Sequence, residues 1–515
     1  MSLRRLLFPA LLFGAVLALI RRAFAGPARA KPVANSAAYD AIDAYVETQM
    51  RRLNMPGVSL AIVKGDKIVH LRGFGRARPG GEAPTPHTPF FIGSLTKSFT
   101  ALAVMQLIEA GKIDLDAPVR RYLPWFRVAD PEASAQVTVR HLLNQTGGLP
   151  NSSGEIVLAD FDTRPDAAER QARALSTLAL TRPVGSAWEY CNSNYSLLGL
   201  IIEAASGESY AGYIQDHIFT ALAMRHSHTS PATAKQNGVA VGHQYRFMVP
   251  FAAPNMPFPH GALAGGGLIS CSEDLARYMI ALLNGGRYGS AQILSAAGID
   301  ELHRGVGDVK AMGMTLGKYG MGWFVDKIGG TKLVFHGGTL PDFASHMALL
   351  PEQKQGVVLL FNACHHWMNP VLADLGNGAA ALLAGEQPAP LAFTRMVPWA
   401  LRGQLLIPLL QIAGVAATLR QLRRWRRDPM SRPSGGLEQG LHILLQLIPN
   451  LLVALTLRPM LGKRRGYLML YMSDYSRIAT ICGSLALVWG FLRTGLVLQV
   501  LRRASSEVTG RSDPD

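Results

Sequence analysis

Cysteine is scarce in this sequence, which has four in 515 residues: Cys191, Cys271, Cys364 and Cys482. They form no C-x-x-C pair, which excludes a zinc ribbon and a dithiol redox motif. The histidine pairs also lack a third ligand at zinc spacing. We therefore expect neither a metal nor a cofactor, and no dependence of the fold on disulfides. A Cys191–Cys271 bridge stays open on the sequence alone.

Phosphate-binding motifs are also missing. The glycine run 265–267 is followed by no G-K-[ST], and no strand with a G-x-G-x-x-G turn accompanies it. Glycines in such a run favour close approach of backbone to other groups. Without the rest of either motif, we do not expect a nucleotide site.

Acidic residues are rare at both ends of the chain. Residues 1–30 contain five Arg and no acid, and residues 391–515 contain 17 Lys or Arg and six acids. The net charge of +16 therefore leaves residues 31–390 with no net charge. Because the basic excess flanks apolar runs, it indicates a lipid bilayer as partner. We expect no nucleic-acid partner.

The N-terminus has the pattern of an export signal. An arginine pair at 4–5 precedes the apolar run 6–20, and A-F-A at 23–25 has the small-x-small form of a cleavage site. Two further arginines, at 21–22, separate the run from that site. Residues 1–30 are thus predicted to be a signal peptide or an uncleaved N-terminal anchor, and an organellar transit peptide is a further alternative.

Three apolar segments of transmembrane length follow Pro388: Val397–Leu419, Leu437–Leu457 and Ile478–Leu501. The alternative is a set of buried helices in a soluble domain. The loop 420–436 carries six arginines and is the better candidate for the cytoplasmic side, although the loop 458–477 also carries five basic residues. We predict a membrane region of about three helices over residues 397–503.

The remaining pattern predicts one mixed α/β (α+β) domain over residues 36–386. An amphipathic helix over 36–53 precedes two strands, and four more strands come late, before a closing helix over 367–384. The expected strands are Gly57–Val63, Lys67–Gly73, Gly320–Asp326, Lys332–His336, Ala344–Leu350 and Gly356–Asn362. This order predicts an antiparallel sheet built from both ends of the domain, flanked by helices, with a helical subdomain inserted between.

Ser94 and Lys97 stand three residues apart where an apolar, helix-period stretch begins. Residues at i and i+3 share one helix face, so the hydroxyl and the amine are expected side by side. The start of a helix also offers free backbone N–H groups and partial positive charge. A serine there becomes a nucleophile when a neighbouring base takes its proton.

Two further stretches complete a candidate site. Tyr190 and Asn192 are two apart, so in an extended loop both side chains point the same way. A lysine ammonium favours the ionised form of a neighbouring tyrosine, which makes a phenolate base feasible. The second stretch is His336-Gly337-Gly338-Thr339, where a glycine-containing strand edge presents a backbone N–H that could form an oxyanion hole with that of Ser94.

In this order the motifs S-x-x-K, Y-x-N and H-x-G resemble those of the serine β-lactamase and penicillin-binding-protein superfamily. The chain is most similar to its class C β-lactamase-related branch. The likeness covers about residues 36–384. It includes F-I-G-S-L-T-K-S-F-T at 91–100, G-K-I-D-L-D at 111–116 and V-R-H-L-L-N-Q-T-G-G-L at 139–149.

The resemblance implies a role for each motif residue. Ser94 would be acylated, and Lys97 and Tyr190 would share the acid–base work. Asn192 would orient Lys97 and the substrate. The strand residues from His336 to Thr339, Gly338 included, would hold the substrate, with the Thr339 N–H in the oxyanion hole. His336 stands where many β-lactamases have the lysine of K-T-G, so a permanent positive charge is missing.

We therefore expect an exported, membrane-tethered serine hydrolase with its catalytic domain outside the cytoplasm. Its expected substrates are amides or esters of peptide-like molecules, as in D-amino-acid peptidases and amidases. Two alternatives stay open: an esterase of the same fold, and a non-hydrolytic membrane receptor that recognises penicillin.

Overall fold

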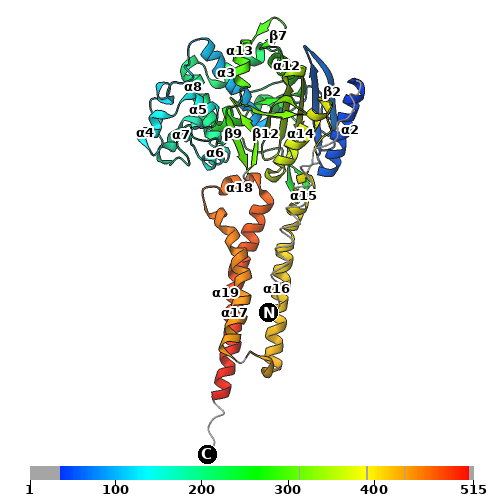
Figure 1. Ribbon diagram of the computed structural model, residues 1–515. Helices are drawn as coiled ribbons and strands as arrows, with labels where there is room; N and C mark the ends of the chain where they lie inside the picture. Colours follow the sequence, from blue (N-terminus) through cyan, green and yellow to red (C-terminus); the bar gives the residue numbers. More distant parts are fainter. Residues whose placement is uncertain (1–34, 312–313, 390–391, 434, 510–515) are drawn as a thin grey trace, which may run out of the picture. The chain divides into compact units, whose positions relative to one another are not determined.

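The computed structural model describes residues 35–509, except for 312–313, 390–391 and 434 (Figure 1). The predicted signal or anchor at 1–30 lies outside the described residues. The chain divides into two compact units, with the boundary between Val397 and Pro398.

The first unit is organised around an antiparallel sheet of eight strands in the order β2-β1-β14-β13-β12-β11-β10-β9. The strands are β1 (Gly57–Lys64), β2 (Lys67–Gly75), β9 (Gly307–Ala311), β10 (Met314–Tyr319), β11 (Phe324–Ile328), β12 (Thr331–Thr339), β13 (Ala344–Leu350) and β14 (Gln355–Phe361). Strands from both ends of the unit meet where β1 pairs with β14. The predicted mixed fold with an antiparallel sheet is thus confirmed.

Helices cover both faces of this sheet. Helix α12 (Ser272–Leu283) packs on β1 and β14, where Met279 contacts Gly356. On the other face, α14 (Asn369–Leu383) packs on β13 and β14 and against α2 (Asn35–Leu53). Every residue of β13 is buried, because this strand lies in the middle of the sheet and α14 packs on it.

The region between β2 and β9 is mainly helical, as predicted (Figure 1). Its central helix is α3 (Thr96–Glu109), which packs against α8 (Asn192–Ser206) and α11 (Leu263–Gly266). Eleven of the fourteen residues of α3 are buried. This burial places α3 in the interior of the unit, with the side chain of Lys97 inside.

One predicted strand was wrong. Residues Gly320–Asp326 do not form a single strand, since β10 ends at Tyr319 and β11 begins at Phe324. The turn between them includes Gly322, which has a φ of +82°. A β-carbon at Gly322 would lie 2.8 Å from the Lys97 carbonyl oxygen. The apolar residues here are buried in the core, which explains why they have a strand-like composition without strand pairing.

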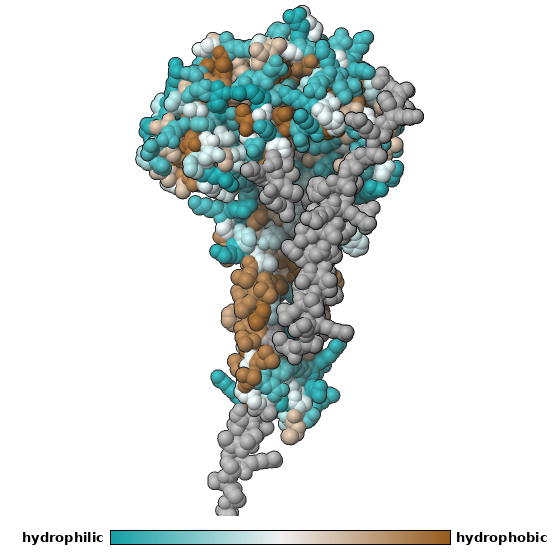
Figure 2. Space-filling model, viewed as in Figure 1, coloured by the Kyte–Doolittle hydropathy of each residue, from teal (hydrophilic) through white to brown (hydrophobic). Residues whose placement is uncertain are grey.

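Among the described residues, three helical segments are long and apolar enough to cross a membrane: Met396–Arg427, Gly436–Leu461 and Ser473–Arg502. Apart from the first two residues of the first segment, they lie in the second unit. Their main helices are α16 (Leu406–Arg427), α17 (Gly436–Ala454) and α19 (Ser473–Thr509). Large apolar side chains such as Leu410 and Phe491 are each 70% exposed, and Figure 2 shows a broad hydrophobic surface on this unit. Such a surface is covered by lipid rather than water, so these helices indicate membrane association.

Candidate active site

Ser94 lies in a short 3-10 turn, η1 (Gly93–Leu95), that leads directly into α3. The chain enters this turn through Gly93, whose φ of +53° suits glycine and few other residues. Ser94 is half-buried, whereas Lys97, one turn further on, has no solvent exposure. The predicted pairing on one helix face is present, since Lys97 Nζ lies 3.1 Å from Ser94 Oγ.

Three acceptors surround the Lys97 amine. Nζ donates to Ser94 Oγ, to Asn192 Oδ1 at 2.8 Å and to the Gly265 carbonyl at 2.5 Å. Burial lowers the pKa of Lys97 to about 7. Both the ammonium and the neutral amine are therefore populated at neutral pH, and the neutral form is able to accept a proton from its serine neighbour.

Tyr190 lies beside the same amine. Lys97 Nζ is 5.0 Å from the centre of the Tyr190 ring and 5.5 Å from that of Tyr195. The loop before α8 is anchored by Asn151, whose side-chain amide donates to the Tyr190 carbonyl at 2.8 Å. The structure thus brings Tyr190 and Asn192 together around Lys97.

The end of β12 lies against the turn that carries Ser94. A β-carbon at Gly93 would come within 2.7 Å of the Thr339 backbone nitrogen, and one at Gly338 within 1.9 Å of the Ile92 carbonyl oxygen. Ser345 Oγ also donates to that carbonyl at 2.7 Å. Only glycines permit this approach, which places the backbone amide of Thr339 close to that of Ser94. Two neighbouring amides of this kind are the usual elements of an oxyanion hole.

His336 lies on the same face of β12 as Gly338, and only 2% of it is exposed. The centroids of Phe324, Tyr319 and Tyr190 lie 5.2, 6.0 and 6.5 Å from that of its ring. Burial, helped by the charge of Lys97, lowers the pKa of His336 to about 3. The imidazole is therefore neutral at physiological pH, and it contributes an aromatic, uncharged surface.

Two groups at this site were not assigned from the sequence. The first is the Gly265 carbonyl, the third acceptor of Lys97. The second is Gln145, whose Oε1 accepts from Cys191 N at 2.9 Å and from Asn194 Nδ2 at 2.6 Å and so fixes the turn into α8. Gln145 belongs to a stretch that the resemblance includes, and Gly265 to the glycine run 265–267, but a backbone carbonyl and a supporting amide have no spacing signature of their own.

All four cysteines are free and buried, so the Cys191–Cys271 bridge is not formed. Cys191 Sγ instead lies 3.2 Å from Ser153 Oγ in the packing behind Asn192.

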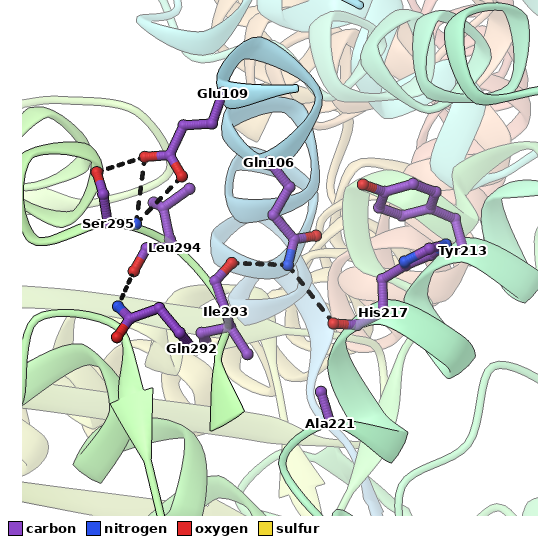
Figure 3. A pocket seen from close by; sticks show the side chains of 9 residues that line it. All are labelled: Gln106, Glu109, Tyr213, His217, Ala221, Gln292, Ile293, Leu294 and Ser295. Atoms are coloured by element: carbon purple, nitrogen blue, oxygen red, sulfur yellow. Dashed lines mark hydrogen bonds between the residues drawn. The ribbon is translucent and has the colours of Figure 1, made fainter. Parts of the chain in front are cut away.

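A cavity of about 430 Å³ lies at the far end of α3 from Ser94 (Figure 3). Its polar groups are engaged in holding a loop to the helix. Glu109 accepts from Ser295 N at 3.2 Å and from Ser295 Oγ at 2.5 Å, and Gln106 Nε2 donates to the Ile293 carbonyl at 2.8 Å. None of the predicted site residues lines this cavity.

A family model for beta-lactamase matches residues 42–381. The chain belongs to the beta-lactamase family. This confirms the predicted resemblance to the β-lactamase and penicillin-binding-protein superfamily, whose members are generally serine hydrolases.

Two individual proteins illustrate the similarity in sequence. Protein flp of Staphylococcus aureus (strain MW2) is 30% identical over 344 residues, which are 65% of this chain and 65% of that protein. Penicillin-binding protein 4 of Amycolatopsis lactamdurans is 29% identical over 313 residues, or 60% of this chain and 81% of that protein. The chain thus matches less than two thirds of the length of the first relative.

A solved structure is similar as well. The octameric penicillin-binding protein homologue from Pyrococcus abyssi superposes with a TM-score of 0.59 and 30% identity, covering 68% of this chain and 78% of that one.

Gly93→Ala is expected to lower turnover about 100-fold, because the new methyl group would push Thr339 N away from Ser94 N, and losing one oxyanion-hole donor costs about 10²–10³ in rate. Steady-state hydrolysis of a chromogenic ester measures the change. Gly111→Ala is the matched control: its φ is +69°, yet a β-carbon there meets nothing within 4 Å. Gly111→Ala has the same backbone strain of about 1 kcal/mol, and we expect it to keep full turnover. Equal losses in both variants would contradict this role of Gly93.

Proposed function

We propose that this protein is a membrane-tethered serine hydrolase that cleaves amide or ester bonds of peptide-like substrates outside the cytoplasm. The observation that carries the proposal is the buried Lys97 amine, 3.1 Å from Ser94 Oγ and with a pKa lowered to about 7. A base with a pKa near the operating pH is the most effective partner for a serine nucleophile.

In the proposed reaction, Ser94 Oγ attacks the substrate carbonyl carbon while its proton passes to the Lys97 and Tyr190 pair. The backbone N–H groups of Ser94 and Thr339 stabilise the oxyanion. The proton then goes to the leaving amine or alcohol as its bond to the carbonyl carbon breaks. Water, deprotonated by the same groups, hydrolyses the ester on Ser94 and regenerates the hydroxyl.

The peptide-like substrate class, with D-amino-acid peptides as its first candidates, is supported by the relative named as a penicillin-binding protein and by the structure titled as a homologue of one. Placement of the catalytic unit outside the cytoplasm is supported by the signal-like pattern at residues 1–30 and by the three apolar helices.

A second candidate, an esterase, is favoured by His336. A neutral, buried imidazole among aromatic rings supplies no counter-charge for a substrate carboxylate. Substrates without a free carboxylate at that position, such as simple acyl esters, are then accepted as well as peptides.

A probe experiment separates these functions. The full-length protein in detergent is incubated with a fluorophosphonate or a penicillin, and the adduct mass is followed with time, alongside a panel of D-alanyl peptides and short acyl esters. Turnover of peptides supports the peptidase, and turnover of esters alone supports the esterase. A stable penicillin adduct with no turnover would favour the receptor over both hydrolases.

The rate of acylation is expected to rise with pH and to level off above a midpoint of about 7. Lys97 must be neutral to accept a proton, so below its pKa the rate falls about tenfold per pH unit. His336, with a pKa of about 3, adds no step between pH 5 and 8. Pre-steady-state labelling by a fluorophosphonate from pH 5 to 9 measures the profile. A midpoint that shifts in His336→Gln would show that the histidine, rather than Lys97, controls it.

A further inference from the structure

The last two turns of α16 carry a basic stripe that the proposed hydrolase does not use. Its members are Arg420, Arg423, Arg424 and Arg427. They stand at positions i, i+3, i+4 and i+7, a spacing that places four side chains on one face of a helix. We call this set the α16 arginine face. All four residues are exposed.

The orientation of this face is fixed by packing on the other side of the helix. Leu422 and Trp425 are buried in a small core with Val497, Val500 and Leu501 of α19. Because this apolar side of α16 is held against α19, the arginines are kept on the outside of the pair.

The arginines line a shared concavity. Its volume is about 350 Å³, and its lining consists of the α16 arginine face and Asp428. Four guanidinium groups around one carboxylate leave a net charge of +3 in a small space. A polyanion is the complementary occupant, and planar guanidinium groups bind phosphate oxygens through paired hydrogen bonds.

The position of the concavity along the helix indicates where that phosphate comes from. The concavity lies at the C-terminal end of the candidate span Met396–Arg427. Two to three turns earlier in the same helix, Leu409, Leu410 and Ile412 are 59%, 70% and 67% exposed, as expected for side chains that face lipid tails. Where an apolar, lipid-facing surface gives way to arginines, phospholipid headgroups are the nearest phosphates.

We infer that the α16 arginine face is a binding site for the headgroup of an anionic phospholipid, such as phosphatidylglycerol. Binding there places this end of α16 in the anionic leaflet on the cytoplasmic side. This inference concerns the membrane unit and does not depend on the chemistry at Ser94.

The test uses the full-length protein in neutral detergent, titrated with phosphatidylglycerol or phosphatidylcholine and analysed by native mass spectrometry. The wild type is expected to retain phosphatidylglycerol in preference to phosphatidylcholine. Replacing all four arginines by glutamine is expected to weaken that retention at least tenfold, since each basic residue near a membrane surface contributes about fivefold. Equal retention of the two lipids by the wild type would overturn the inference.

A matched variant controls for charge alone. Arg458, Lys463, Arg464 and Arg465 form a second group of four basic residues in the same unit. Changing these four to glutamine removes the same charge and is expected to weaken phosphatidylglycerol retention far less than the change on α16 does. Equal loss in both variants would show unspecific attraction and contradict a site on α16. A third arm adds inorganic phosphate without lipid, and saturation of the site by free phosphate at low concentration would also overturn the lipid assignment. Far-UV circular dichroism and melting temperature verify that each variant is folded.

Discussion

Ser94→Ala is expected to abolish fluorophosphonate labelling and to reduce hydrolysis by roughly 10⁴- to 10⁶-fold, the range observed when a catalytic serine is removed. The hydroxyl forms the covalent bond, so the variant lacks the atom with which the probe and the substrate react. Any residual rate comes from the oxyanion donors acting on a bound substrate and water. Intact-mass analysis after labelling, together with steady-state hydrolysis, gives both numbers.

Ser98→Ala is the matched control for this variant. Ser98 is one turn further along α3, is fully buried, and donates to the Leu95 carbonyl at 2.8 Å. Its loss removes one hydrogen bond, which costs about 1 kcal/mol of stability, and leaves labelling intact. If Ser94→Ala were still labelled at the rate of the wild type, the nucleophile would be a different residue and the proposed function would fail.

Much of this site was open to prediction because its chemistry depends on local spacing. Ser94 and Lys97 share a helix face at i and i+3. Tyr190 and Asn192 are separated by a single residue. The chain brings both pairs to one amine, with Asn192 Oδ1 2.8 Å from Lys97 Nζ. The late strands were also accessible to prediction, since β13 and β14 are rich in apolar residues and are joined by a short turn.

What the sequence did not predict depends on contacts between distant segments. The Gly265 carbonyl accepts from Lys97 across 168 positions, and no residue type marks a carbonyl for that role. Likewise, the ends of β10 and β11 are set by the packing of Gly322 on the Lys97 backbone rather than by alternation. The burial of His336 among aromatic rings also arises only when β11 and β12 pair. The neutral state of His336 is therefore caused by its burial among these rings, which the residue type alone did not reveal.

Lys97→Met is expected to lower acylation about 10²- to 10⁴-fold, the usual contribution of a general base, while the protein stays folded. Methionine fills nearly the same volume and removes the cost of burying an amine. The same substitution leaves Asn192 Oδ1 and the Gly265 carbonyl without their donor, which costs about 1–3 kcal/mol each. The gain from removing a buried amine and the loss of its two hydrogen bonds oppose each other. Near pH 7 we therefore expect only a small change in the free energy of unfolding, beside a large change in rate.

The pH dependence of stability distinguishes this explanation from simple loss of packing. In the folded protein the pKa of Lys97 is about 7, well below the value of about 10.4 in an unfolded chain. Between these pH values the unfolded chain binds one more proton, so the free energy of unfolding of the wild type rises with pH by up to about 1.4 kcal/mol per unit relative to Lys97→Met. Melting temperatures of the detergent-solubilised proteins from pH 6 to 10 measure that difference. Lys112→Met, at an exposed position just beyond α3, is expected to change neither the rate nor the slope. A constant difference between wild type and Lys97→Met across this range would show that Lys97 stays charged in the folded state, and it would remove the amine as the base that activates Ser94.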